Sequence, residues 1–307
     1  MPGAKQALYL NRSFDTHHYH SNLLRAGTFH CPADHPQFQD TGPIEGWLIV
    51  FPRTSVTIAQ EGRFPFVADP NTIVYYNRGQ PYRRGLVSAE GDICDWFAFD
   101  PALVVELVAQ YDDSVYRREL TPFTVSHSPC QTALYLQQRL IVRQLRHPDH
   151  DPLAVEEAAV NLLAAAVALA YQRATGVSSR RKQETRRAHR QLARDAATYL
   201  AVHFRQPLTI GEIAAALATS PYHLCRVFKR EIGRSLHQHL SNLRLRATLE
   251  PLADSAIDLT TIGLDFGFAS HSHFSAAFRK AFGLTPSQFR VDASRRHCPQ
   301  MSRILKA

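Results

Sequence analysis

The sequence lacks the segments that mark exported and membrane proteins. Its N-terminus has no charged stretch followed by an apolar stretch, which is the pattern of a secretory signal. The longest apolar run, Ala158 to Tyr171, has 14 residues, contains Asn161 and is too short to span a bilayer. The five cysteines are an odd number in a chain without an export signal, which favours a reduced compartment. We therefore expect a cytoplasmic protein without a membrane partner.

The ligand set of a metal-dependent enzyme is also incomplete. Metal-dependent cupins need a His-x-His pair, a Glu four or five residues later and a further His. His18 and His20 supply the pair, but the next Glu is Glu45, and no His occurs between His35 and His127. We therefore expect that the protein has no catalytic residues, requires no cofactor and is not an enzyme.

A second metal hypothesis concerns Cys31, His35 and Cys94. Thiolates and an imidazole suit zinc, and Cys31 and His35 are four residues apart. That spacing is a weak signal on its own. Buried cysteines and a loop histidine without metal are the main alternative, and zinc binding at the three residues is retained as a hypothesis.

Positive charge is present in excess, but only in the C-terminal part of the chain. Residues 184–307 contain 18 Lys and Arg against 9 Asp and Glu, whereas residues 1–183 contain 17 against 18. A confined basic surplus is typical of a surface that neutralises the phosphates of nucleic acid. The basic region therefore predicts binding to double-stranded DNA.

Two similar helical units occupy this basic region. In the first, Thr209 and Glu212 have the spacing of a capping box. Ser220 and Pro221 then predict the start of a second helix after a short turn. The apolar face of that helix contains Leu224, Val227 and Phe228, so that the outward side chains are Tyr222, Cys225, Arg226 and Lys229.

The second unit repeats this plan 50 residues later, with Ser270 as the cap after a turn at Gly267. The predicted buried face of its second helix contains Phe274, Ala277, Phe278 and Phe282, and the outward face contains His271, Ser272, His273, Ala276 and Arg279. A helix from Leu236 to Ala247 and beyond, about 16 residues or roughly 24 Å long, connects the units. Such helix-turn-helix units could place two recognition helices in successive major grooves, roughly 34 Å apart.

Two stretches of the basic region carry a family resemblance. Residues Ile262 to Arg290 read IGLDFGFASHSHFSAAFRKAFGLTPSQFR, and residues Ser220 to Ser235 read SPYHLCRVFKREIGRS. Both strings resemble the signature of AraC/XylS-type transcription regulators and cover about a third of the chain. The resemblance implies a seven-helix DNA-binding domain fused to a regulatory domain that forms a homodimer. It also implies a small-molecule effector, RNA polymerase as a partner and activation of transcription.

The resemblance also implies roles for individual side chains. Members of the family read bases from the positions of Arg226, Tyr222 and Cys225. Ala276 departs from the pattern, because an Arg often contacts a base there. His271, Ser272 and His273 are left to read the second site, while Arg279 and Lys280 suit phosphates. Pro251 is a further departure, and it predicts that the connecting helix kinks or stops near Glu250.

The N-terminal half contains short runs rich in β-branched and aromatic residues. Six strands are predicted, at Leu23–His30, Gly46–Phe51, Ser55–Gln60, Thr72–Tyr76, Tyr82–Ser88 and Ile93–Phe99. Met1 to His20 is expected to be irregular. The strands indicate a small β-barrel or sandwich, and the resemblance implies a cupin-like barrel. The whole chain is therefore predicted as α+β, with an all-α C-terminal domain.

Three helices are predicted after the strands, starting at the pairs Asp100-Pro101, Ser128-Pro129 and Asp151-Pro152. They would form a helical hairpin beside the barrel. The third is apolar around much of its circumference, and packing on the barrel and a dimer interface are equally supported. The predicted domains are residues 1–175, a linker at 176–183, the DNA-binding domain at 184–291 and a tail at 292–307.

Two other classes of DNA-binding protein fit less well. DNA-repair methyltransferases of the Ada type share the same helix-turn-helix domain but need clustered cysteines, and the cysteines here are scattered. A structural nucleoid protein would lack the roughly neutral N-terminal half that is able to form a core. A sequence-specific transcription regulator remains the preferred interpretation.

Overall fold

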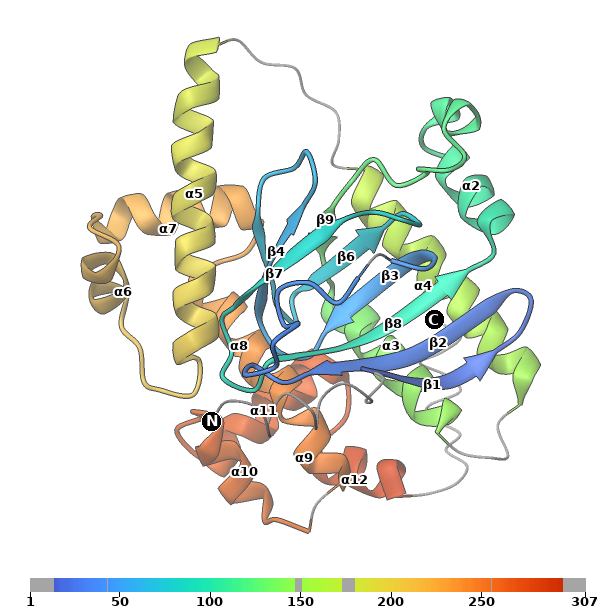
Figure 1. The fold of residues 1–307 in the computed structure, drawn as a ribbon. Helices are drawn as coiled ribbons and strands as arrows, with labels where there is room; N and C mark the ends of the chain where they lie inside the picture. The colour runs from blue at the N-terminus through green and yellow to red at the C-terminus, as the bar shows by residue number, and fades with distance from the viewer. Residues whose placement is uncertain (1–13, 43, 147–150, 173–179, 255, 295–307) are drawn as a thin grey trace, which may run out of the picture. The chain divides into compact units, whose positions relative to one another are not determined.

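The computed structural model describes residues 14–42, 44–146, 151–172, 180–254 and 256–294, without the side chains of residues 180–186 and 222. The chain forms two compact units (Figure 1). Residues 1–130 and 137–174 make up the first unit, and residues 131–136 and 175–307 the second. The predicted α+β class is confirmed, because the strands belong to the first unit and the second is helical.

The strands of the first unit form two antiparallel sheets. Their bounds are β1 (Asp15–His20), β2 (Leu24–Cys31), β3 (Trp47–Pro52), β4 (Val56–Gln60), β5 (Phe66–Ala68), β6 (Thr72–Tyr76), β7 (Tyr82–Leu86), β8 (Asp92–Phe99) and β9 (His127–Pro129). The larger sheet has the order β1-β2-β8-β3-β6-β9, and the smaller has β5-β4-β7. All six predicted strands are present within one or two residues of their predicted ends.

Three strands were not predicted, because their side-chain pattern is not that of a buried strand. β1 is polar, with the sequence DTHHYH, and pairs only with β2 at the edge of the sheet. The prediction of an irregular segment is therefore wrong for Asp15–His20. β5 and β9 have only three residues each, so they carry almost no periodic signal.

The prediction of a closed barrel is also wrong in detail. In the described part of the chain, each sheet ends in strands that pair on one side only, namely β1 and β9 in the larger sheet and β5 and β7 in the smaller. A barrel needs continuous hydrogen bonding around its circumference, which three-residue edge strands do not supply. The arrangement is the open sandwich that was the second option.

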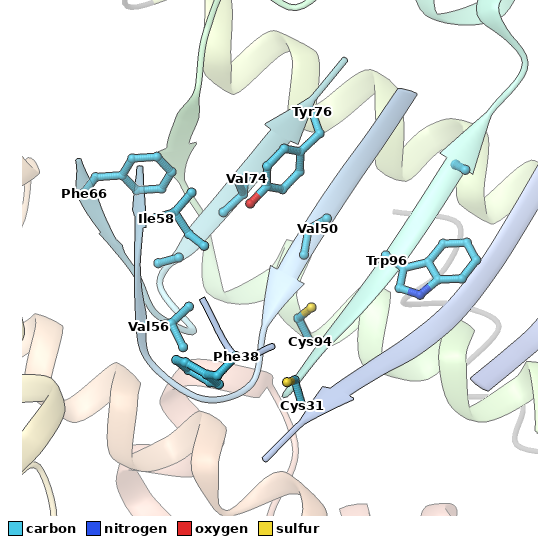
Figure 2. Close-up of a cluster of buried hydrophobic side chains, with 12 residues drawn as sticks. Cys31, Phe38, Val50, Val56, Ile58, Phe66, Val74, Tyr76, Cys94 and Trp96 are labelled. Carbon is cyan, nitrogen blue, oxygen red and sulfur yellow. The ribbon is translucent and has the colours of Figure 1, made fainter. Parts of the chain in front are cut away.

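The larger sheet is buried on both faces, because side chains alternate along each strand. Val50, Val74 and Trp96 of the larger sheet share one apolar cluster with Val56 and Ile58 of the smaller sheet (Figure 2). On the opposite face, the Tyr75 hydroxyl donates to the carbonyl oxygen of Ala166 at 2.7 Å, in helix α4 (Pro152–Tyr171). The first unit is therefore layered as small sheet, large sheet and helices.

The helices of the first unit only partly follow the prediction. Asp100 and Asp151 cap α2 (Pro101–Ala109) and α4 as expected. A 3₁₀ helix, η1 (Asp113–Arg117), follows α2. The helix start at Ser128-Pro129 is wrong, since α3 begins three residues later and spans Thr132–Leu145. Ser128 instead lies in β9, where its hydroxyl is 2.8 Å from that of Tyr75 and cannot act as a helix cap.

Helix α4 has 20 residues and, judged by length and composition only, is apolar enough to cross a membrane. The helix predicted to start at Asp151-Pro152 is therefore present, and it is longer than the 14-residue apolar run that it contains. Core helices of globular proteins have the same composition, and nine residues of α4, among them Leu162 and Leu163, are buried within the chain. Packing against the sheet accounts for this apolar surface, and a dimer role stays a prediction.

The second unit contains eight helices in the part that the structure describes. They are α5 (Arg180–His203), α6 (Ile210–Ala216), α7 (Pro221–Ile232), α8 (Leu236–Ala247), α9 (Leu249–Asp254), α10 (Leu259–Asp265), α11 (His271–Phe282) and α12 (Pro286–Ser294). Because α5 begins at Arg180, the linker predicted at 176–183 is helical in its last four residues, and residues 176–179 lie outside the described ranges. Arg, Lys and Gln are good helix formers. Helix α12 similarly continues into the predicted tail.

The connecting helix is interrupted as predicted, but earlier than expected. Helix α8 ends at Ala247, and Thr248 separates it from α9, which gives eight helices instead of seven. Pro251 has no N–H to donate to the Ala247 carbonyl, so the hydrogen-bond ladder is broken at that point. The Thr248 hydroxyl donates to the carbonyl oxygen of Leu245 at 2.7 Å and closes the end of α8.

Candidate nucleic-acid interface

The first helix-turn-helix unit, α6 and α7, is built by its caps and its apolar face. Thr209 and Glu212 form the predicted capping box, with the Thr209 N–H donating to Glu212 Oε2 at 2.7 Å. Ser220 Oγ accepts from the backbone N–H of His223 at 3.2 Å and starts α7. The predicted core residues Leu224, Val227 and Phe228 are all buried. Helix α7 is thus held by packing along one face only.

The opposite face of α7 carries the predicted DNA-binding side chains. Arg226 and Lys229 are exposed. Cys225 differs from the prediction, because it is half-buried and packs against the core beside Leu224. Its position one residue after Leu224 places it at the border of the apolar face, so that it contacts the core and is still partly exposed. The side chain of Tyr222 lies outside the described residues.

Helix α5 packs against α7 and steadies its outward face. The ring of His189 is 5.4 Å from that of His223, and a hydrogen bond joins His189 Nδ1 to the Arg230 guanidinium. Burial and the positive charge of Arg230 lower the pKa of His189, which favours the neutral ring that accepts this bond. These contacts could not be predicted from the sequence, because His189 and Arg230 are 41 positions apart.

The second helix-turn-helix unit, α10 and α11, has the same construction as the first. Ser270 Oγ accepts from the N–H of His273 at 3.1 Å. Phe274, Phe278 and Phe282 are buried as predicted, whereas Ala277 is only half-buried. A Cβ atom at Gly263 would lie 3.1 Å from that of Phe274, so a glycine there lets the two helices approach closely. Like α7, α11 has 12 residues and ends at a glycine with positive φ.

The outward face of α11 is polar but has less charge near its start. The predicted residues His271, Ser272, His273, Ala276, Arg279 and Lys280 are all exposed. His271 Nε2 is 3.4 Å from the hydroxyl of Ser275. The ring of His273 meets that of Phe268 edge to face, with centroids 5.6 Å apart. His273 therefore has a packing contact even though its side chain is exposed.

Arg244 connects the two helix-turn-helix units, and its contacts could not be predicted from the sequence. Arg244 of α8 donates from Nε to the Phe204 carbonyl at 2.6 Å and from Nη2 to the Gln206 carbonyl at 2.7 Å. The turn before α11 lies against the same guanidinium, because a Cβ at Gly267 would be 2.9 Å from Arg244 Cζ and 2.8 Å from the Arg205 carbonyl. The end of α5, the connecting helix and the second turn thus meet at Arg244.

The zinc hypothesis is not supported by the geometry. Among the described residues, no three His, Cys, Asp or Glu side chains are placed to hold a metal ion together, so Cys31, His35 and Cys94 do not form such a group. His35 Nδ1 accepts from the Gln37 N–H at 3.1 Å. Burial raises the pKa of Cys31 to about 11 and also raises that of Cys94, which disfavours the thiolate form that binds zinc.

Comparison with known proteins agrees with this construction. Residues 213–292 match the family model of a helix-turn-helix domain. The HTH-type transcriptional regulator ArgR of Pseudomonas aeruginosa is 38% identical over 88 residues, which cover 29% of this chain and 27% of ArgR. The regulatory protein SoxS of Escherichia coli is 28% identical over 103 residues, covering 34% of this chain and 96% of SoxS.

A solved structure of a transcriptional regulator of Chromobacterium violaceum, with an AraC-type DNA-binding domain, is 27% identical to this chain. The match covers 36% of this chain and 97% of that protein's chain, with a TM-score of 0.33. Residues 213–292 of the second unit are thus a helix-turn-helix domain by the family-model match. Through this domain the chain is similar to transcription regulators such as ArgR and SoxS. The chain spans less than a third of the length of ArgR.

Proposed function

We propose that the chain is a sequence-specific transcription regulator that reads two successive major grooves with α7 and α11. The observation that carries this proposal is the repeated unit. Two 12-residue helices, each capped by a serine, bury one apolar face and expose a polar face. The N-terminal residues of such a helix reach base edges in the major groove. We assign DNA contacts to Tyr222, Cys225, Arg226, Lys229, His271, Ser272, His273 and Arg279.

The first unit is proposed to bind a small-molecule effector and to form the homodimer. A cavity of about 310 Å³ lies between its two sheets, at the lower end of the size range of small-molecule sites. We further propose a cytoplasmic location, a DNA-binding domain at residues 184–291, RNA polymerase as a partner for activation, and no enzymatic activity. These assignments follow from the family and from the inventory of side chains.

Selection of binding sites from random-sequence DNA with the full chain tests the DNA-reading proposal. We expect two clusters of base preference separated by about one helical turn, roughly 10 base pairs. The cluster read by α7 should be sharper, because Ala276 in α11 is unable to hydrogen-bond a base. A single cluster, or binding without any base preference, would contradict the proposal.

If the first unit forms a homodimer, the full chain and a fragment without that unit should differ in their affinity for DNA with two sites. A fragment of residues 184–290 should bind one selected site with an affinity close to that of the full chain. On DNA with two such sites, the full chain should bind more tightly, since a linked second domain acts at high effective concentration. Titrations of both proteins on both DNAs measure the difference. Equal affinities on the two-site DNA would show that residues 1–183 do not dimerise.

The histidines at the start of α11 give a further prediction. Histidine gains positive charge as the pH falls, and nearby phosphates favour the charged form. Binding to selected DNA should therefore tighten between about pH 8 and pH 6. The double variant His271→Asn, His273→Asn should lose most of this dependence. If the folded double variant keeps the affinity and pH profile of the wild type, the histidines serve packing alone, as the contact of His273 with Phe268 would allow.

A further inference from the structure

The cavity in the first unit has walls suited to a hydrocarbon. Side chains from both sheets line it, including Val50, Val74, Ile58 and Trp96 (Figure 2). Trp96 and Val50 are almost fully buried, and the inner face of the larger sheet supplies most of this surface. An apolar ligand body would therefore replace water along most of the cavity.

Most polar groups of the cavity already have partners within the protein. Asp92 accepts from Arg84 Nη1 at 2.8 Å, and the hydroxyls of Thr41 and Tyr82 are 3.3 Å apart. Asp15 Oδ1 accepts from the indole N–H of Trp96 at 2.7 Å. Burial raises the pKa of Asp15, which disfavours its charged form. None of these groups therefore calls for a charged ligand.

Arg25 is the exception. It lies on β2 opposite Ala98 of β8, on the face that lines the cavity, and it is half-buried. A Cβ at Gly46 would be 3.1 Å from Arg25 Nη2, so the guanidinium lies directly beside the Gly46 backbone. In the part of the chain that the structure describes, no hydrogen bond or ion pair engages this guanidinium. A half-buried positive charge without a partner suits an anion.

We propose that the cavity binds a small organic carboxylate, with the carboxylate on the Arg25 guanidinium and an apolar body against Trp96 and Val50. A planar guanidinium matches a carboxylate through two parallel hydrogen bonds. Glu45, a second charged residue that lines the cavity, is exposed to water. The inference rests on the proposed effector role of the first unit and specifies the chemical class of the effector.

Fluorescence titration of the full chain tests this proposal. Both tryptophans of the sequence, Trp47 and Trp96, belong to the first unit, so that Trp47→Phe leaves Trp96 in the cavity wall as the reporter. The probes are benzoate and hexanoate, their uncharged amides benzamide and hexanamide, and the amines benzylamine and hexylamine. We expect the carboxylates to change the Trp96 emission in a saturable way at lower concentration than the amides or amines.

Arg25→Gln, made in the same background, should weaken carboxylate binding roughly 10- to 100-fold and leave amide binding within about 2-fold. Arg83→Gln is the matched control, because Arg83 is exposed on β7 and does not line the cavity. It should bind the probes as the wild type does. Preferential binding of amines, binding of no probe, or equal loss in both variants would overturn the proposal.

DNA binding by the same samples separates this inference from the proposed function. If the chain binds its selected DNA but shows no preference for carboxylates, only the ligand class is wrong. If carboxylates bind in the cavity in an Arg25-dependent manner while the chain binds no specific DNA, the inference stands and the DNA-reading proposal fails.

Discussion

Replacing Arg84 by alanine is expected to destabilise the first unit by about 3 to 5 kcal/mol, because it leaves the Asp92 carboxylate buried without its counter-charge. The Arg84 side chain is fully buried and makes three hydrogen bonds, to Asp92, to the Phe38 carbonyl and to the Thr41 hydroxyl. Its guanidinium also lies 4.6 Å from the centroid of the Phe29 ring. No other group can take over these contacts at once.

Urea unfolding followed by tryptophan fluorescence measures this effect, since Trp47 and Trp96 both belong to the first unit. Arg83→Ala is the control, because the neighbouring Arg83 is exposed and its loss should change the free energy of unfolding by no more than about 0.5 kcal/mol. Equal effects of the two variants would show that the buried pair contributes nothing to stability.

The pH dependence of the Arg84→Ala variant sharpens this prediction. Burial already raises the pKa of Asp92 in the wild type, against the opposing charge of Arg84. Without Arg84 that pKa should rise further above its value in the unfolded chain. A carboxyl with a raised pKa in the folded state makes stability fall as the pH rises. The loss should therefore be larger at pH 8 than at pH 5, and a loss independent of pH would contradict this explanation.

Replacing Arg226 by alanine is expected to weaken specific DNA binding by about 1 to 3 kcal/mol, the value of a bidentate contact to guanine. Arg226 is exposed on the outward face of α7, one turn after the helix start, where side chains reach base edges. The preference for one base of the selected site should relax at the same time. Gel-shift or fluorescence titrations on selected and random DNA measure both effects.

Lys229→Ala provides the contrast for Arg226→Ala. Lys229 is also exposed on α7, one turn further from its start, where a phosphate contact is expected. Its loss should weaken binding to selected and random DNA alike. It should also reduce the salt dependence of DNA binding by the amount expected for about one phosphate contact. If Arg226→Ala behaves in the same way as Lys229→Ala, Arg226 contacts only phosphate and the assignment is wrong.

The two helix-turn-helix units could be predicted from the sequence because their signals are local. Thr209, Ser220 and Ser270 each bond to a backbone N–H three residues ahead, so the cap and its partner lie in one turn. The buried positions of α7 and α11 repeat every three or four residues, as the helix period requires. The helix period does not decide the exposure of Cys225, which lies at the border of the apolar face and is half-buried.

The sequence by itself determined the starts of α2, α4, α6, α7 and α11, the buried faces of the recognition helices and six of the nine described strands. Only the tertiary structure decided which distant groups meet. Arg244 contacts carbonyls about 40 residues earlier, Trp96 donates to Asp15 across 81 residues, and the polar strand β1 forms only because β2 offers it an edge. The partners of such contacts are chosen by the packing of the whole unit, and no periodic pattern within one segment records them.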